Sequence, residues 1–399
     1  MRALFLNHNV VRTGTFQRAS CLARELVAAG HDITLVTTSR DLRAGGRESE
    51  WHGVRIIESP DLFTGVARTG WDPWNTAWRT RRLTAERFDL IHAFDSRPAV
   101  ILPAVALRRR TGVPLFIDWA DWWGRGGTIT ERSGWAVRTF FSPVETWFEE
   151  AFRIEATANT TIVESLRERC IALGVEPGRV IALPNGCVRP AADPPSRAEA
   201  RRALGIGEHP LVLHLGVMLP ADSTFLFDAF RRVREVQPAA RLAMVGPYRG
   251  NVPADLLHVV QRPGFVEEGA LAQWLAAADV GVLVLRDTIA SRGRWPGKLS
   301  DYLTGGVPIA MTRVGAAAEL LGGAGAAALA APLPEALART VLGLLDDAAA
   351  RASMSRAARA LATGALSWKA VAERLLEFYA QQRITSGGGR DRALTQHAP

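Results

Sequence analysis

The sequence predicts an α/β protein built from two Rossmann-like domains. The chain has 399 residues, which is too long for one ordinary hydrophobic core. In both halves, short apolar strand candidates alternate with amphipathic helix candidates, which is typical of a parallel sheet covered by helices on both faces. A proline-rich stretch at residues 184–196 separates the two series and has the composition of a linker.

The first series begins with a short apolar strand candidate at residues 3–8. In the next segment, 18–31, apolar residues recur at helical spacing and stop at Gly30, which predicts a helix. The series then continues with strand candidates at 32–38, 52–59, 88–94 and 113–118 and a helix candidate at 99–110.

The second series repeats this order, with strand candidates at 211–216, 240–246, 256–262 and 280–286 and helix candidates at 224–236 and 271–279. In open α/β sheets, ligands bind beyond the carboxyl ends of the strands, so we expect a site in the cleft between two such domains. The expected division is an N-terminal domain at 1–188, a C-terminal domain at 189–365, a last helix at 366–383 and a disordered tail at 384–399.

Composition limits the class of protein. Apolar residues make up 48% and charged residues 22% of the chain, as in ordinary globular proteins. No apolar run approaches the roughly 18 residues of a membrane span, and the first run breaks at Asn7, which is unlike a signal peptide. The cysteines Cys21, Cys170 and Cys187 are odd in number and widely spaced, which predicts neither a disulfide framework nor a metal site, so we expect a protein of the reducing cytoplasm.

The net charge of +8 comes almost entirely from arginine, because Lys298 and Lys369 are the only lysines. Such a balance suits anionic substrates, anionic lipid or nucleic acid. No basic block with interleaved aromatic residues occurs, so we do not expect nucleic acid as a partner.

The turn after the first strand contains Thr13, Gly14 and Thr15 at the start of a helix, where backbone N–H groups can bind an anion. The alternative is that Gly14 only permits a tight turn. The turn lacks the GxGxxG pattern, which makes a nicotinamide-dependent dehydrogenase a poor candidate.

The most informative segment is 291–321, where Arg292, Arg294 and Lys298 precede a predicted helix. Cations and helix-terminal N–H groups can converge there on a diphosphate. Asp301 follows Lys298 by about one helical turn and could accept hydrogen bonds from a ribose diol. Alternatively, Lys298 is an ordinary surface lysine, and Asp301 is an acid that only stabilises the helix dipole.

These motifs resemble the large retaining glycosyltransferase family 4, which has the GT-B fold. The family's Pro-x-Lys-Leu-x-Glu-Tyr-x-x-x-Gly-x-Pro-Val pattern is matched by Pro296, Lys298, Leu299, Tyr302, Gly306, Pro308 and Ile309, and Asp301 stands where the family has Glu. Further matches, in the expected order, are Gly14, LPNG at 183–186, the strand end at Gly216, and GFV at 264–266.

The resemblance implies a glycosyltransferase whose N-terminal domain binds the acceptor and whose C-terminal domain binds a nucleotide diphosphate-sugar. It places Lys298 and Arg294 on the diphosphate, Asp301 on the ribose, and the backbone near Phe265 and Val266 on the base. It also implies transfer with retention, with the leaving diphosphate helping to deprotonate the acceptor and without a cofactor or obligatory metal. The last helix would cross back to the N-terminal domain.

The sequence departs from the family at two points. The family's paired acids are eight positions apart, but Gly293 stands eight residues before Asp301, so the first acid is missing or replaced by a neighbour such as Asp287. The usual Arg and Lys pair is absent from the segment after Gly216. Two alternative functions therefore remain: a nucleotide-sugar epimerase or hydrolase of the same fold, and a non-catalytic partner protein.

On the acceptor side, Asp118 and Asp121 follow the strand candidate at 113–118 and are the catalytic candidates. Either carboxylate could act as a base or orient a hydroxyl, or could only cap a local turn. We favour Asp121, because it lies further into the loop. Asp95 and Arg97 are weaker candidates, and His92 is expected in the core.

Nine of the twelve tryptophans lie before residue 150. Aromatic rings stack on sugars, suit membrane interfaces or simply pack in the core. Between residues 132 and 152, Trp, Phe and Arg could form an interfacial helix, although intervening acids count against it. The expected acceptor is a glycan, a lipid-linked sugar or a small molecule, with peripheral membrane contact as one option.

Overall fold

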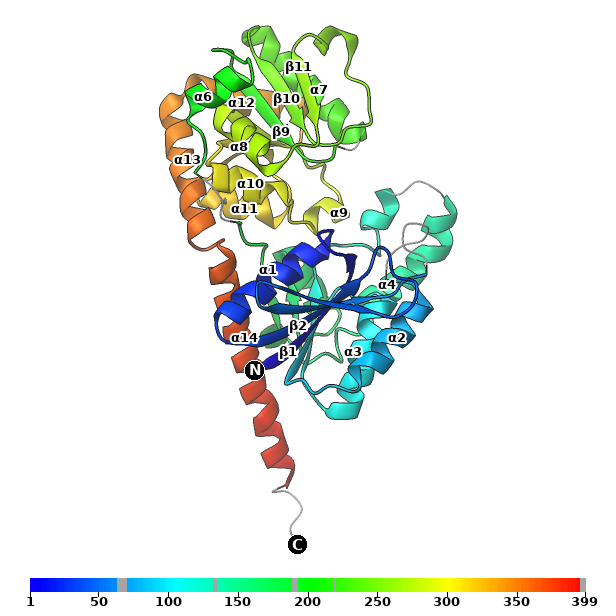
Figure 1. Ribbon diagram of the computed structural model, residues 1–399. Coiled ribbons are helices and arrows are strands. Elements are labelled where there is room, and N and C mark those ends of the chain that lie inside the picture. Colours follow the sequence, from blue (N-terminus) through cyan, green and yellow to red (C-terminus); the bar gives the residue numbers. More distant parts are fainter. Residues whose placement is uncertain (63–69, 132–134, 189–192, 219, 395–399) are drawn as a thin grey trace. The chain divides into compact units, whose positions relative to one another are not determined.

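The computed structural model describes residues 1–62, 70–131, 135–188, 193–218 and 220–394 (Figure 1). The chain divides into two compact units. The first comprises Met1–Asn185 and Trp368–Pro399, and the second comprises Gly186–Ser367. Each unit contains one sheet flanked by helices, which confirms the predicted α/β fold with two Rossmann-like halves.

The sheet of the first unit has the strand order β3-β4-β2-β1-β5-β6-β7-β8. Neighbouring strands are parallel, except that β3 and β4 are antiparallel. The bounds are β1 Arg2–Val10, β2 Asp32–Thr38, β3 Arg47–Trp51, β4 Val54–Ser59, β5 Leu90–Phe94, β6 Leu115–Trp119, β7 Ala158–Thr161 and β8 Val180–Ala182.

Helices cover both faces of this sheet. On one face, α1 (Thr15–Ala28) and α14 (Trp368–Leu394) pack against the strands through a shared apolar core. On the other face, α2 (Pro73–Leu83) and α3 (Pro98–Thr111) contribute to a second core. The remaining helical segments are η1 Thr128–Glu131, η2 Val137–Phe141, α4 Ser142–Glu150, α5 Glu164–Ala172 and η3 Pro177–Arg179.

Helix α14 belongs to the first unit although it lies at the C-terminal end of the chain. Its Arg374 donates to the carbonyl of Ala182, and Gln382 donates to that of Gly178. The helix continues to Leu394, beyond the expected end at residue 383. Residues 395–399, the end of the expected tail, lie outside the described residues.

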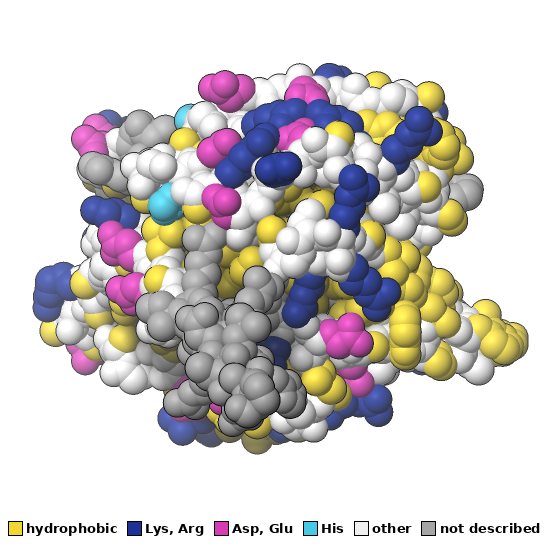
Figure 2. All heavy atoms as spheres, turned by 90° about the horizontal axis from the view of Figure 1, so that it is seen from below, with side chains coloured by type: hydrophobic (Ala, Val, Ile, Leu, Met, Phe, Trp, Pro, Cys, Tyr) yellow, Lys and Arg dark blue, Asp and Glu magenta, His cyan; other side chains and the backbone are white. Residues whose placement is uncertain are grey.

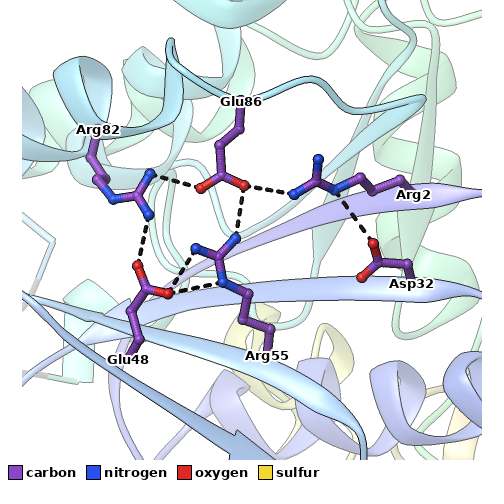
Figure 3. Close-up of polar contacts among 6 residues, drawn as sticks. All are labelled: Arg2, Asp32, Glu48, Arg55, Arg82 and Glu86. Atoms are coloured by element: carbon purple, nitrogen blue, oxygen red, sulfur yellow. Dashed lines mark hydrogen bonds and ion pairs between the residues drawn. The ribbon is translucent and has the colours of Figure 1, made fainter.

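The edge strand β3 is polar and exposed, and its Glu48 joins a surface network of ion pairs (Figure 3). Glu48 of β3 accepts from Arg55 of β4 and from Arg82 of α2, each at 2.7 Å. Glu86 accepts from Arg82, Arg55 and Arg2, and Arg2 also faces Asp32. Charged side chains on an edge strand discourage pairing with another chain.

The sheet of the second unit has the order β11-β10-β9-β12-β13-β14, and all neighbours are parallel. Its strands are β9 Leu211–Leu215, β10 Arg241–Val245, β11 Val260–Gly264, β12 Val280–Leu283, β13 Ile309–Thr312 and β14 Ala327–Ala330. Its helical segments are α6 Arg197–Ala203, α7 Pro220–Val236, η4 Ala254–Leu256, α8 Glu268–Ala277, α9 Ile289–Arg292, α10 Lys298–Gly305, α11 Gly315–Gly323, α12 Pro334–Asp346 and α13 Ala348–Thr363.

The core of the second unit lies where α7 and α12 pack on the strands. Across the described part of the chain, no helix combines the length and the apolar character needed to cross a membrane.

Candidate active site

Three neighbouring strands of the second unit each lead into a glycine with a positive φ. Gly216 follows β9, Gly246 follows β10 and Gly264 ends β11, with φ values of 83°, 128° and 76°. A Cβ at Gly246 would lie 2.7 Å from the carbonyl oxygen of Gly216, so no side chain fits there. The glycines therefore leave bare backbone at the carboxyl ends of the strands, which is where open α/β sheets bind ligands.

Helix α10 is fixed to this edge of the sheet by Tyr302. The buried phenol donates to the carbonyl of Leu213 in β9 at 2.9 Å and accepts from the N–H of Leu215 at 3.1 Å. A side chain at Gly281 in β12 would meet the Tyr302 ring at 2.8 Å, so this glycine makes room for it. These contacts place the first residue of α10, Lys298, beside the end of β9.

Lys298 brings a positive charge to the glycine-lined edge. A Cβ built on Gly216 would lie 3.6 Å from Cε of Lys298, so the lysine chain runs past this glycine. Burial lowers the pKa of Lys298 to about 8; Asp222 opposes this shift and Arg294 adds to it. The predicted diphosphate-binding cations Lys298 and Arg294 are thus close enough to influence each other electrostatically.

His214 of β9 is the partner of Lys298. Its Nε2 lies 3.3 Å from Nζ of Lys298. Burial, and then the adjacent ammonium, hold the pKa of His214 well below 6.5, so the imidazole is neutral and its Nε2 accepts a hydrogen bond from Nζ of Lys298. Sequence reasoning assigned no role to His214.

Asp301 lies in the first turn of α10, where the sequence placed it. Its carboxylate makes no hydrogen bond or ion pair with any other described residue, and burial raises its pKa to about 6. A half-buried carboxylate without a partner within the described fold is available to accept hydrogen bonds from a ligand.

Two further features belong to the second unit. Asp222 of α7 pairs with Arg286, which follows β12, at 2.9 Å. Phe265, directly after β11, is 81% exposed, and Val266 is half-buried. A base-binding role for the backbone near Phe265 and Val266 stays a prediction.

Asp287, the proposed substitute for the missing first acid of the family pattern, is occupied by an ion pair. Asp287 and Arg292 form an exposed ion pair, with 2.6 Å and 2.9 Å between their atoms. Gly293 is buried and ends the four-residue helix α9. An acid at position 293 would therefore stand at a buried position.

In the first unit, the turn at Thr13, Gly14 and Thr15 satisfies much of its own hydrogen-bonding capacity. The Thr15 N–H donates to the side chain of Asn9, and the Phe16 N–H donates to the carbonyl of Thr13. A Cβ at Gly14 would lie 2.6 Å from Asn9, and the φ of 52° also favours glycine. An anion at this turn would compete with these contacts, and its binding here stays a prediction.

Asp118, at the end of β6, is fully buried. Arg18 of α1 donates to both of its carboxylate oxygens at 2.9 Å, and Thr160 donates to Oδ1 at 2.5 Å. Burial alone would raise the pKa of Asp118, but the Arg18 guanidinium brings it below the usual range. Proton transfer from an acceptor to Asp118 would require these contacts to open, so the geometry favours a structural role.

The Asp118 pair belongs to a longer buried chain of hydrogen bonds. His92 Nε2 lies 3.1 Å from the Thr160 hydroxyl, and His92 Nδ1 lies 2.5 Å from the hydroxyl of Tyr379 on α14. Since Thr160 donates to Asp118, it accepts from His92 Nε2, and Nδ1 then accepts from Tyr379. His92 is buried, as the sequence predicted.

Asp121 is half-buried in the loop after β6. Glu149 of α4 holds this loop by accepting from the N–H groups of Trp123 and Gly124, at 2.8 Å and 2.7 Å, and from Trp119 Nε1. Glu149 therefore fixes the backbone of the loop that carries Asp121. The catalytic role of Asp121 stays a prediction.

A second polar cluster lies at the ends of β1 and β5. His8 Nε2 is 2.8 Å from Oδ2 of Asp95, and the Arg97 guanidinium lies 5.0 Å from the ring centre of Trp123. Burial, and then Arg97, lower the pKa of His8 to about 4, although Asp95 opposes the shift. Asp95 has a φ of 86°, a strained backbone found more often at functional sites. Sequence reasoning missed His8, because its strand resembles a purely apolar one.

No group of three or more His, Cys, Asp or Glu in the described residues could hold a metal ion.

Comparison with known families gives the same division of the chain. Residues 13–186 match the glycosyl transferase 4-like domain, and residues 209–347 match the glycosyl transferases group 1. No curated protein matches the sequence.

Three solved structures illustrate the shared fold. Sucrose-phosphate synthase from Thermosynechococcus elongatus has a TM-score of 0.70 at 15% identity, with 96% of this chain and 100% of that chain covered. Anabaena Alr3699/HepE in complex with UDP has a TM-score of 0.69 at 16% identity, with the same coverage. The α,α-trehalose 6-phosphate synthase from Burkholderia multivorans has a TM-score of 0.63 at 15% identity, covering 100% of this chain and 99% of that chain. Together these matches show that the chain is a glycosyltransferase of the GT-B fold, built from a glycosyl transferase 4-like half and a group 1 half.

Proposed function

We propose that the protein transfers a glycosyl group from a nucleotide diphosphate-sugar to an acceptor hydroxyl, with retention at the anomeric carbon. The observation that carries the proposal is the ammonium of Lys298, partly buried beside a neutral His214 at the glycine-lined end of β9. A partly buried cation next to bare backbone suits a diphosphate. The complex of Alr3699/HepE with UDP, in a protein of the same fold, supports this ligand class.

In this proposal, Lys298 and Arg294 bind the diphosphate, and Asp301 accepts hydrogen bonds from the ribose. The backbone at Gly216 lies against the phosphates, and the segment with Phe265 and Val266 contacts the base. The leaving diphosphate helps to remove the proton of the acceptor hydroxyl, so the reaction needs neither a metal nor another cofactor.

The acceptor binds to the first unit. Asp121 is the proposed group that orients or deprotonates the acceptor, and the pair of His8 and Asp95 supplies a second polar centre. The acceptor is a glycan, a lipid-linked sugar or a small molecule rather than nucleic acid, and the reaction takes place in the cytoplasm.

A nucleotide-sugar epimerase or hydrolase of the same fold is the second candidate, and a non-catalytic partner is the third. Gly293 favours both, because it stands where the family has its first paired acid. The test is to incubate the protein with nucleotide sugars, with and without a panel of acceptors, and to separate the products. A transferase forms a glycoside of unchanged anomeric configuration, and nucleoside diphosphate release depends on the acceptor.

Release of free sugar without acceptor would indicate a hydrolase, and an altered donor sugar would indicate an epimerase. Binding without any turnover would indicate a non-catalytic protein. The matched controls are Lys298→Ala, which should lose turnover, and Lys369→Ala. Lys369 is the other lysine of the chain, and its side chain is 79% exposed on α14.

A further inference from the structure

The segment around α4 exposes a row of large apolar side chains. The most exposed are Phe140 at 69%, Trp135 at 68% and Trp147 at 55%. Val137, Val144 and Ile154 are exposed as well. We call these six residues the aromatic face. Apolar side chains scattered singly over a surface are ordinary, but these six fall within about twenty residues of one segment, and the ring centres of Trp135 and Phe140 lie 5.9 Å apart. An exposed apolar cluster of this kind is typical of an interaction site.

The acids of this segment do not lie on the aromatic face. Glu145, Glu149 and Glu150 are buried. Glu149 holds the loop after β6, and Glu150 pairs with Arg125 and Arg169 at 2.9 Å and 2.8 Å. The sequence alone suggested that these acids count against an interfacial role. They do not, because their side chains are buried in the first unit. Residues 132–134 of the segment lie outside the described residues.

Arginines border the aromatic face. Arg138 belongs to the same segment, between Val137 and Phe140, and is exposed. Phe152, whose ring centre is 5.3 Å from that of Trp147, lines a pocket together with Arg108 and Arg109 at the end of α3. Arg110, the next residue of α3, is exposed. Glu155, an exposed acid of this segment, lies in the same pocket beside Arg108.

Figure 2 shows hydrophobic side chains gathered toward the side on which α3 and α4 lie in Figure 1, with arginine side chains beside them. Tryptophan and phenylalanine with neighbouring arginine is the composition of segments that lie in a membrane interface, where the rings enter the headgroup region. Arginine at the border attracts anionic lipids.

We infer that the aromatic face docks the first unit onto an anionic lipid surface. The apolar rings supply burial in the interface, and Arg109, Arg110 and Arg138 supply the preference for negative charge. Neither group overlaps with the proposed donor-binding residues, so this inference is independent of the proposed function.

The test is cosedimentation of the full chain with vesicles of phosphatidylcholine alone or of phosphatidylcholine mixed with phosphatidylglycerol. The wild-type protein should bind the mixed vesicles more tightly, and added salt should weaken this binding. The triple variant Trp135→Ser, Phe140→Ser, Trp147→Ser should bind at least tenfold more weakly to the mixed vesicles. The variant Arg109→Gln, Arg110→Gln, Arg138→Gln should lose the preference for the mixed vesicles.

The matched control is Val236→Ser with Leu257→Ser, which changes apolar residues of the second unit that are 67% and 59% exposed, and which should bind like the wild type. A second measurement uses the single conservative substitution Trp135→Phe, which keeps an aromatic ring. Lipids with brominated acyl chains should quench the tryptophan fluorescence of the wild type more than that of Trp135→Phe. Absence of vesicle binding, equal binding by the triple variant, or equal quenching would overturn the inference. So would a dimer that forms in solution without lipid and is lost in the triple variant, because a second copy would then cover the face.

Discussion

Lys298 and His214 meet at the end of β9, where the lysine Nζ lies 3.3 Å from Nε2 of a buried imidazole. Burial lowers the pKa of both groups, which means that the positive charge of Lys298 is poorly solvated. A bound diphosphate would restore the lost stabilisation. The site therefore gains affinity for an anion at the expense of the stability of the free protein.

Replacing Lys298 by methionine should stabilise the ligand-free protein. The folded pKa of about 8 lies below the ordinary lysine pKa of 10.5, so the native state binds fewer protons than the unfolded state between these two pH values. The penalty for charging Lys298 is fully present below pH 8 and disappears above about pH 10.5. At pH 7, Lys298→Met should raise the free energy of unfolding by up to about 3 kcal/mol, measured by urea denaturation. Lys369→Met is the control and should change little; a less stable Lys298→Met would contradict the account.

The affinity for a nucleotide diphosphate-sugar should have a bell-shaped pH dependence. Asp301, with a pKa of about 6, accepts hydrogen bonds best when ionised, so affinity should fall as the pH drops below 6. Lys298 loses its charge above its pKa of about 8, so affinity should also fall above that pH. Titration of UDP-glucose at several pH values measures both limbs. Asp301→Asn should remove the acid limb, and an acid limb that persists in this variant would assign it to another group.

Asp118→Asn should lower stability more than activity. The change leaves Arg18 buried without its charged partner, which typically costs about 3–5 kcal/mol. The control Asp255→Asn breaks the exposed pair with Arg231 and should cost no more than about 1 kcal/mol. Thermal melting measures the difference, and the turnover of folded protein should stay near that of the wild type. An Asp118→Asn protein of normal stability with little turnover would instead make Asp118 catalytic.

Asp121→Asn should lower the catalytic rate and leave donor affinity nearly unchanged, because it lies in the first unit and the proposed donor residues lie in the second. The amide keeps the volume of the carboxylate, so the melting temperature should not move. Rate and donor affinity are measured on the same preparation. A changed donor affinity with an unchanged rate would remove Asp121 from the acceptor side.

The fold and the donor helix could be predicted because they depend on local patterns. Alternating apolar segments predict both sheets, and Lys298 and Asp301 lie within one turn of α10. Contacts between distant segments carry no such signal. His214 precedes Lys298 by 84 positions, and Arg18 precedes Asp118 by 100 positions. The sequence position that made Asp118 a catalytic candidate therefore gave no sign of Arg18, which donates to both of its carboxylate oxygens.

The α4 segment illustrates the same limit on a helix surface. Its sequence mixes acids, arginines and aromatic residues, which weakens an interfacial interpretation. Glu145 and Glu149 are four residues apart and so share one helix face, and the fold turns that face inward. Which face of a helix is buried depends on the strands beneath it, and these were not visible in the segment itself.

The central claim is that Lys298 binds the diphosphate of the donor. Its most direct test is to titrate UDP-glucose into the wild-type protein, Lys298→Ala and Lys369→Ala, with binding measured by calorimetry and by thermal shift. The account predicts saturable binding by the wild type and by Lys369→Ala, with a stabilisation of about 2.7 kcal/mol at a hundred times the dissociation constant. Lys298→Ala should fold normally and show neither heat nor shift. If Lys298→Ala binds UDP-glucose as tightly as the wild type, the diphosphate site is not at Lys298 and the account is wrong.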